Sequence, residues 1–198
     1  MKFAPLVGGL IGLAGGLIYW LAVQVWPASV AVILAMAATT LLSFSFGPAR
    51  DLAALPLNRA DVSLQLLYLL VKYSTLMALT AAKLPFAAPA EATLGLVMIC
   101  GYAASGALMV SVWTITPGEP AKLNNTDLGI ALLIGFAPAA LLGIPGLTGL
   151  AAAIVVSFAF TIYVKITGAV RTAQRLELTQ QLTESAFYLG ALATWSYV

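Results

Sequence analysis

Histidine is missing from this 198-residue sequence, cysteine occurs once, and charged residues make up only 8% of the chain. Without histidine there is no histidine metal ligand and no histidine general base. The single cysteine, Cys100, excludes a disulfide within the chain. It lies in an apolar run, as is typical of a small residue packed between helices. A net charge of +2 is too small to indicate a nucleic-acid partner.

The scarcity of charge also excludes an ordinary soluble domain, in which about 25% of residues are charged. Apolar residues make up 62% of the chain, and they form long runs without strict alternation. Runs of this kind are typical of membrane helices, because a helix satisfies its backbone hydrogen bonds within the segment. The sequence therefore predicts an all-α, polytopic transmembrane bundle that forms one domain over residues 1–198, with the lipid bilayer as a partner.

Seven membrane spans are expected, at residues 5–26, 28–46, 64–82, 91–115, 127–142, 147–166 and from the end of a polar stretch to residue 198. That polar stretch covers residues 167–184. Because the last span is short, six spans and an interfacial helix are the alternative. In the first span, Gly8, Gly12 and Gly16 form two overlapping GxxxG patterns, which predict the close approach of another helix.

Lysines and arginines favour the cytoplasmic side of a membrane. With the N-terminus inside, only Lys83 lies outside, whereas the inside segments hold Lys2, Arg50, Arg59, Lys122, Lys165, Arg171 and Arg175. Lys72 lies within a span and is not counted. We therefore expect a multi-pass protein of the inner (cytoplasmic) membrane, with its N-terminus in the cytoplasm and its polar face on that side.

Lys72 is the most unusual residue, because a charge in the middle of a membrane helix is costly. It is expected to face the bundle interior, either as a functional residue or as a packing residue paired with a carboxylate or carbonyl. Glu184 is expected where the last helix enters the bilayer, where a carboxyl group can accept a proton or bind a ligand. The alternative for that region is an interfacial helix whose basic face meets anionic lipid.

Other polar side chains are candidates for ligand binding. Arg50 and Arg59, in a loop with Asp51, can bind phosphate, although alternating charges of this kind more often form a solvated loop. The remaining candidates of the polar stretch are Arg171, Arg175, Gln180 and Gln181. Paired carboxylates suited to Mg²⁺ are not evident, since the acids are scattered singly. No metal site or cofactor is therefore expected from the residues alone.

Three stretches carry a resemblance to a known family: FAPLVGGLIGLAGGLIYWLAVQVWP at residues 3–27, LLYLLVKYSTLMAL at 66–79 and GAVRTAQRLELTQQLTESAFYLGALA at 168–193. Together they resemble the cobalamin-5'-phosphate synthase family (adenosylcobinamide-GDP ribazoletransferase). The resemblance implies a membrane fold and the Mg²⁺-dependent joining of GDP-activated adenosylcobinamide to α-ribazole. It also carries over Lys72, Gln180, Gln181 and Glu184.

The chain departs from that family where the family has its acids. An HxDGLADxxDG-type motif is expected after the early helices, but this chain reads SFSFGPARDLAAL at residues 43–55, with Asp51 as its one acid. The pattern is that of a divergent member whose framework is kept and whose catalytic acids are lost.

The favoured hypothesis is a non-catalytic membrane subunit, assembly factor or holder of a hydrophobic ligand, in contact with other membrane chains. An active transferase with a rebuilt site of Arg50, Asp51, Lys72 and Glu184, using Mg²⁺, is the first alternative. A small transporter is the second.

Overall fold

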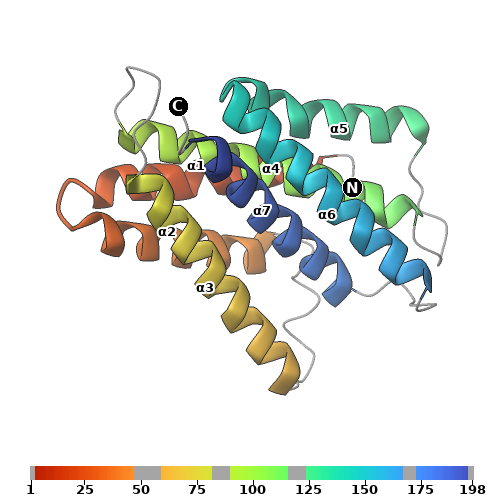
Figure 1. The fold of residues 1–198 in the computed structure, drawn as a ribbon, viewed down its shortest axis with the longest axis horizontal. Coiled ribbons are helices and arrows are strands. Elements are labelled where there is room, and N and C mark those ends of the chain that lie inside the picture. The colour runs from red at the N-terminus through yellow and green to blue at the C-terminus, as the bar shows by residue number, and fades with distance from the viewer. Residues whose placement is uncertain (1–2, 47–58, 82–89, 116–123, 167–172, 196–198) are drawn as a thin grey trace.

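The protein forms a bundle of α-helices in a computed structural model that describes residues 3–46, 59–81, 90–115, 124–166 and 173–195. These residues form seven helices and no strand (Figure 1). The helices are α1 (Ala4–Ala22), α2 (Ala28–Phe46), α3 (Arg59–Ala81), α4 (Ala90–Ile115), α5 (Asn125–Ala140), α6 (Ile144–Ile166) and α7 (Ala173–Trp195). The predicted all-α fold is confirmed.

Two helices begin well before the expected spans. Helix α3 begins at Arg59, a residue that the sequence placed in a polar loop. Helix α6 begins at Ile144 and takes in Pro145 and Gly146, which were expected to form a turn. Proline is tolerated in the first turn of a helix because its missing N–H has no partner there in any case. The turn before α6 is therefore shorter than predicted, and it contains Gly143 with a φ of 64°.

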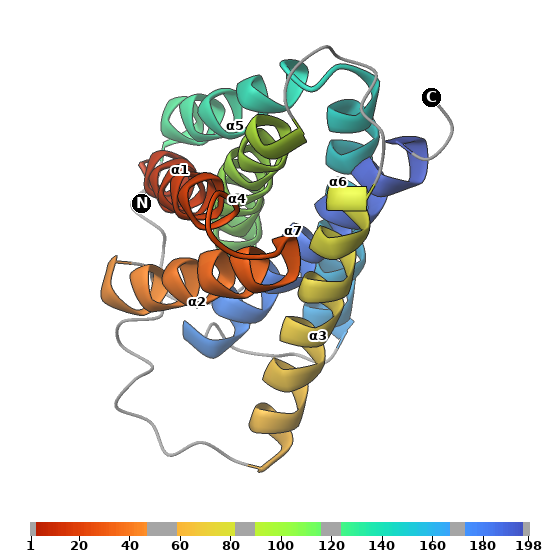
Figure 2. The same cartoon turned by 90° about the vertical axis from the view of Figure 1, so that its left-hand side faces the viewer.

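Helix α4 lies at the centre of the bundle, where it packs against α1, α3, α5, α6 and α7. Its side chains are almost all buried from 93 to 112. Helix α1 packs along one side of it, and α7 lies between α4, α6 and α3 (Figure 2). Helix α3 lies at the side of the bundle, where it contacts α7, α2 and α4.

The glycines of α1 allow its close contact with α4. A Cβ atom added to Gly12 would lie 2.7 Å from both the Met98 carbonyl oxygen and the Ile99 Cα, and one added to Gly16 would lie 2.8 Å from the Gly95 Cα. The predicted close approach is thus confirmed, and the neighbour is a helix of the same chain. This glycine face is already covered, so it gives no support to contact with other membrane chains.

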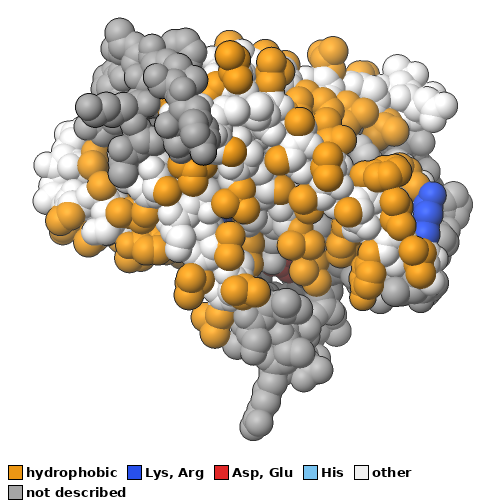
Figure 3. Space-filling view, viewed as in Figure 1, with side chains coloured by type: hydrophobic (Ala, Val, Ile, Leu, Met, Phe, Trp, Pro, Cys, Tyr) orange, Lys and Arg blue, Asp and Glu red, His pale blue; other side chains and the backbone are white. Residues whose placement is uncertain are grey.

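The outer surface of the bundle is apolar. Large hydrophobic side chains point outward from the helices. Figure 3 shows them spread over one face of the described residues, with a basic side chain at one edge. Helix α1, residues 93–115 of α4, and α6 are long and apolar enough to cross a membrane, and α2, α3 and α5 contain shorter apolar segments. This is the surface of a membrane helix bundle, in which lipid rather than water surrounds the outer side chains.

Candidate functional site

Lys72 of α3 and Glu184 of α7 form an ion pair inside the bundle. The Lys72 Nζ lies 2.7 Å from the Glu184 Oε1, and the two side chains are 1% and 2% exposed. Lys72 therefore faces the interior, as predicted. Glu184 was expected at the end of a polar stretch, where the last helix enters the bilayer; the structure places it in the middle of α7, which is one continuous helix. Lys72 compensates the charge of this buried carboxylate.

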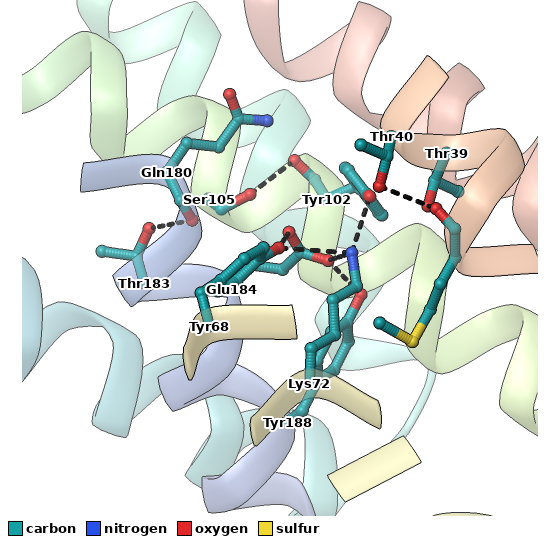
Figure 4. A network of polar contacts seen from close by, with 11 residues as sticks. Thr39, Thr40, Tyr68, Lys72, Tyr102, Ser105, Gln180, Thr183, Glu184 and Tyr188 are labelled. Carbon is teal, nitrogen blue, oxygen red and sulfur yellow. Dashed lines mark hydrogen bonds and ion pairs between the residues drawn. The ribbon is translucent and has the colours of Figure 1, made fainter. Parts of the chain in front are cut away.

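Three tyrosines surround the pair (Figure 4). Tyr68 lies one turn before Lys72 on α3, and its hydroxyl donates to the Glu184 Oε2 at 2.7 Å. Tyr188 lies one turn after Glu184 on α7, and its hydroxyl donates to the Glu184 Oε1 at 2.8 Å. The Tyr102 hydroxyl of α4 accepts from the Lys72 Nζ at 2.7 Å. Lys72, Glu184, Tyr68, Tyr102 and Tyr188 are called the charged cluster below.

Both charges of the cluster are satisfied within the protein. The Lys72 ammonium has acceptors in Glu184, Tyr102 and, at 3.3 Å, the Tyr68 hydroxyl, and the Glu184 carboxylate accepts from one lysine and two phenols. Burying a charge is tolerable only when its hydrogen bonds and its counter-charge are supplied within the protein. Here both are supplied, so the cluster is electrically neutral and joins α3, α4 and α7.

Hydroxyl groups around the cluster are bonded to their own helices. Thr39 of α2 donates to the Met36 carbonyl, Ser105 of α4 to the Tyr102 carbonyl, and Thr183 of α7 to the Thr179 carbonyl. All three donors are fully buried. Back-bonding of this kind is how serine and threonine satisfy their hydroxyls inside membrane helices. The polar surroundings are therefore already satisfied in large part, as the dashed lines in Figure 4 indicate.

Gly101 makes room for Tyr188. A Cβ atom added to Gly101 would overlap the Tyr188 ring, with the ring Cζ at 2.8 Å and the hydroxyl oxygen at 3.0 Å. We expect Gly101→Ala to push the ring aside, weaken its bond to Glu184 and lower the free energy of unfolding by about 1–3 kcal/mol, as overpacking does. Unfolding in detergent micelles, followed by tryptophan fluorescence, measures this loss.

The matched control is Gly129→Ala in α5, because nothing lies within 4 Å of a Cβ atom added there. This change is expected to be neutral or to stabilise the helix by up to about 1 kcal/mol. In a Tyr188→Ala background, Gly101→Ala should lose most of its cost, because the ring that it displaces is gone. An equal cost in both backgrounds would place the strain elsewhere.

The predicted site residues fall into three groups. Lys72 and Glu184 come together. Gln180 and Gln181 are half-buried on α7; the Gln181 Nε2 donates to the Glu177 Oε1 at 3.2 Å, and Figure 4 shows the Gln180 side chain pointing away from the ion pair. The others cannot be placed relative to the cluster: Arg50, Asp51 and Arg171 lie outside the described residues, as do the side chains of Arg59 and Arg175.

The three tyrosines were not predicted from the sequence. The spacing of Tyr68 before Lys72 and of Tyr188 after Glu184 is the one signal that could have found two of them, since residues four apart share a helix face. Among the residues whose placement is described, no group of three or more potential metal-ligating side chains occurs. The charged cluster contains one carboxylate, so it does not match the donor set that Mg²⁺ prefers.

Comparison with known proteins finds a partial relationship. The chain is 57% identical over 42 residues to an adenosylcobinamide-GDP ribazoletransferase of Leptothrix cholodnii and 56% identical over 46 residues to one of Ralstonia nicotianae. The matched stretches cover 21% and 23% of this chain, but only 16% and 18% of these relatives. No family model and no solved structure matches the chain. The chain is therefore a membrane protein related in part to these transferases.

Proposed function

We propose that this chain is a non-catalytic membrane protein on a cobalamin-synthase-like framework, and that it acts as a subunit or assembly factor of a membrane complex. The observation that carries the proposal is the charged cluster, in which the charges of Lys72 and Glu184 compensate each other. Lys72 and Glu184 bind each other and three tyrosines, which leaves them engaged in holding helices together. The proposal includes an inner-membrane location with the N-terminus in the cytoplasm.

A second candidate function is favoured by the comparisons. Both relatives are named as adenosylcobinamide-GDP ribazoletransferases, and the identity over the matched stretches is high. In this alternative, an active site rebuilt around Arg50 and Asp51 joins adenosylcobinamide-GDP to α-ribazole with Mg²⁺. The two candidates differ in whether any transferase activity remains.

An activity assay separates them. Purified protein is incubated with adenosylcobinamide-GDP, α-ribazole and Mg²⁺ at high protein concentration, with a relative such as the Leptothrix enzyme as the positive control. We expect no product above the level of a heat-treated sample. Product formation that Asp51→Asn abolishes would overturn the non-catalytic proposal and establish the rebuilt site.

The positive side of the proposal is tested in the native membrane. Solubilisation in mild detergent should release the chain as part of a defined complex of larger mass, with the same partner recovered after crosslinking in intact membranes. A chain that is monodisperse, alone and uncrosslinked at native expression level would contradict the subunit proposal, whatever the outcome of the activity assay.

A further inference from the structure

The Lys72 ammonium is bound as a ligand would be. A lysine ammonium has three N–H donors and no acceptor. Three oxygen atoms surround it: the Glu184 Oε1 and the Tyr102 hydroxyl, each at 2.7 Å, and the Tyr68 hydroxyl at 3.3 Å. The number of acceptors matches the number of donors of a primary ammonium. A quaternary ammonium has no N–H to donate to them, and a planar guanidinium presents its donors in a different geometry.

The two short contacts come from the bundle and not from α3. Glu184 belongs to α7, and its Oε1 is held by the Tyr188 hydroxyl at 2.8 Å. Tyr188 in turn fits against Gly101 of α4. Tyr102 also belongs to α4, the most central helix, and is 3% exposed. The two oxygens at 2.7 Å from the ammonium are therefore positioned in part by contacts within α4 and α7, as a binding site is organised before its ligand arrives. Tyr68 of α3 adds a bond to the other carboxylate oxygen, Glu184 Oε2, at 2.7 Å.

Apart from the charged cluster, α3 packs an apolar inner side, with Leu76 and Leu79 in the core, against the bundle. Its outward leucines, Leu66, Leu67 and Leu70, are 59–65% exposed. Figure 2 shows α3 running along the side of the bundle rather than through it. Lys72, by contrast, is among the largest side chains that are fully buried. The ammonium is thus the charged group on the inner side of α3, between the apolar contacts of Leu76 and Leu79 and the bond that Tyr68 makes to Glu184.

We propose that Glu184 and Tyr102 form a binding site for a primary ammonium, and that Lys72 is the ligand built into the chain, so that α3 docks on the bundle by ammonium recognition. Removing the lysine side chain leaves the site intact and empty. A small primary amine of matching length then fills it and restores the contact between the helices.

The test is rescue of Lys72→Ala by n-propylammonium, which corresponds to the atoms that the substitution removes beyond Cβ. Docking of α3 is read from a cysteine introduced in place of Thr75, a residue of α3 that is 4% exposed. The protein carries Thr75→Cys and Cys100→Ala, so that N-ethylmaleimide labels only the introduced thiol. We expect Lys72→Ala to raise the labelling rate about tenfold through local opening, and n-propylammonium to bring the rate back toward that of the parent.

Matched compounds and variants define the chemistry. Tetramethylammonium and n-propanol at the same concentration should leave the labelling fast, because neither presents a charged group with three N–H donors. In Lys72→Ala/Glu184→Ala the amine should have no effect. Native Cys100, which is fully buried on α4, reports global unfolding and should stay protected in a Lys72→Ala protein without the other changes.

Two results would overturn the proposal. The first is that n-propylammonium does not slow the labelling of the Lys72→Ala protein. An equal slowing by tetramethylammonium, or by n-propylammonium in Lys72→Ala/Glu184→Ala, counts as the same result. The other is labelling of Cys100 that rises as much as labelling of the thiol introduced by Thr75→Cys, since the loss would then be global. If Lys72→Ala cannot be purified alone, n-propylammonium is included from solubilisation onward, and the yield of monodisperse protein replaces the labelling rate. A yield that the amine does not raise contradicts the proposal equally.

Discussion

Glu184→Gln alone is expected to cost about 3–5 kcal/mol of unfolding free energy, because it leaves the buried Lys72 ammonium without its counter-charge. Lys72→Met alone is expected to cost a similar amount, since the Glu184 carboxylate then keeps only the two phenol donors. Both values are a large part of the unfolding free energy of a typical domain, so the single variants are expected to unfold in milder detergent conditions. Unfolding by sodium dodecyl sulfate from mixed micelles, followed by circular dichroism, measures both.

The double variant Lys72→Met/Glu184→Gln is expected to recover most of that loss and to lie within about 1 kcal/mol of the parent. It removes both charges of the pair. The amide introduced by Glu184→Gln can still bond both phenols, since its carbonyl accepts from one of them and its NH2 group donates to the other. Replacing a buried ion pair by neutral groups is often close to neutral, whereas removing one partner is not. The coupling between the two sites is obtained from the double-mutant cycle.

Thr148→Val supplies the control for this cycle. The Thr148 hydroxyl lies 2.8 Å from the Thr194 hydroxyl and joins α6 to α7 without any charge. Hydrogen bonds between membrane helices contribute about 0.6 kcal/mol on average, so this change should cost far less than either single charge variant. If Glu184→Gln lowered the unfolding free energy no more than Thr148→Val does, the ion pair would not be the main interaction that holds α3 against the bundle.

The helices were predictable because each contains a long apolar run. Such a run is required by the surrounding lipid, whichever helices it packs against. Their ends were less predictable. Arg59 was placed in a loop because charged residues surround it, yet it begins α3. Pro145 and Gly146 were read as a turn, yet they lie in the first turn of α6. In both cases the local composition is typical of a loop. Polar residues and proline are nevertheless tolerated in the first turn of a helix, so composition alone does not locate the helix start.

The sequence identified two residues of the charged cluster, but not how they are arranged. Lys72 stood out because a lone charge in a membrane helix needs a partner. Glu184 was also identified as a candidate, but the polar residues before it indicated a membrane surface. Its ion pair with Lys72 was not predictable, because α3 and α7 are far apart in the sequence. Tyr102 was missed because the sequence around a tyrosine in an apolar helix does not show which residues of other helices it contacts. Its bond to Lys72 depends on how α4 packs against α3.

Gly12→Ala tests the second large contact of the bundle, that between α1 and α4. A Cβ atom at this position meets backbone atoms of Met98 and Ile99 at 2.7 Å, and backbone cannot move aside as the end of a side chain can. The two helices must therefore separate along the crossing. We expect a loss of about 1–3 kcal/mol in the unfolding free energy, in spite of the higher helix propensity of alanine.

A second glycine of α1 provides the control that decides whether this loss comes from packing. A Cβ atom at Gly9 meets only the Ala103 Cβ, at 3.8 Å, which is an ordinary contact. Gly9→Ala should therefore be neutral or gain up to about 1 kcal/mol from helix propensity, although it lies within one turn of Gly12 on the same helix. Equal effects of Gly9→Ala and Gly12→Ala would mean that propensity, and not the close approach of α1 to α4, sets the cost. A loss confined to Gly12→Ala would show that this glycine face holds the chain's own bundle together, so that contacts with other membrane chains have to use a different surface.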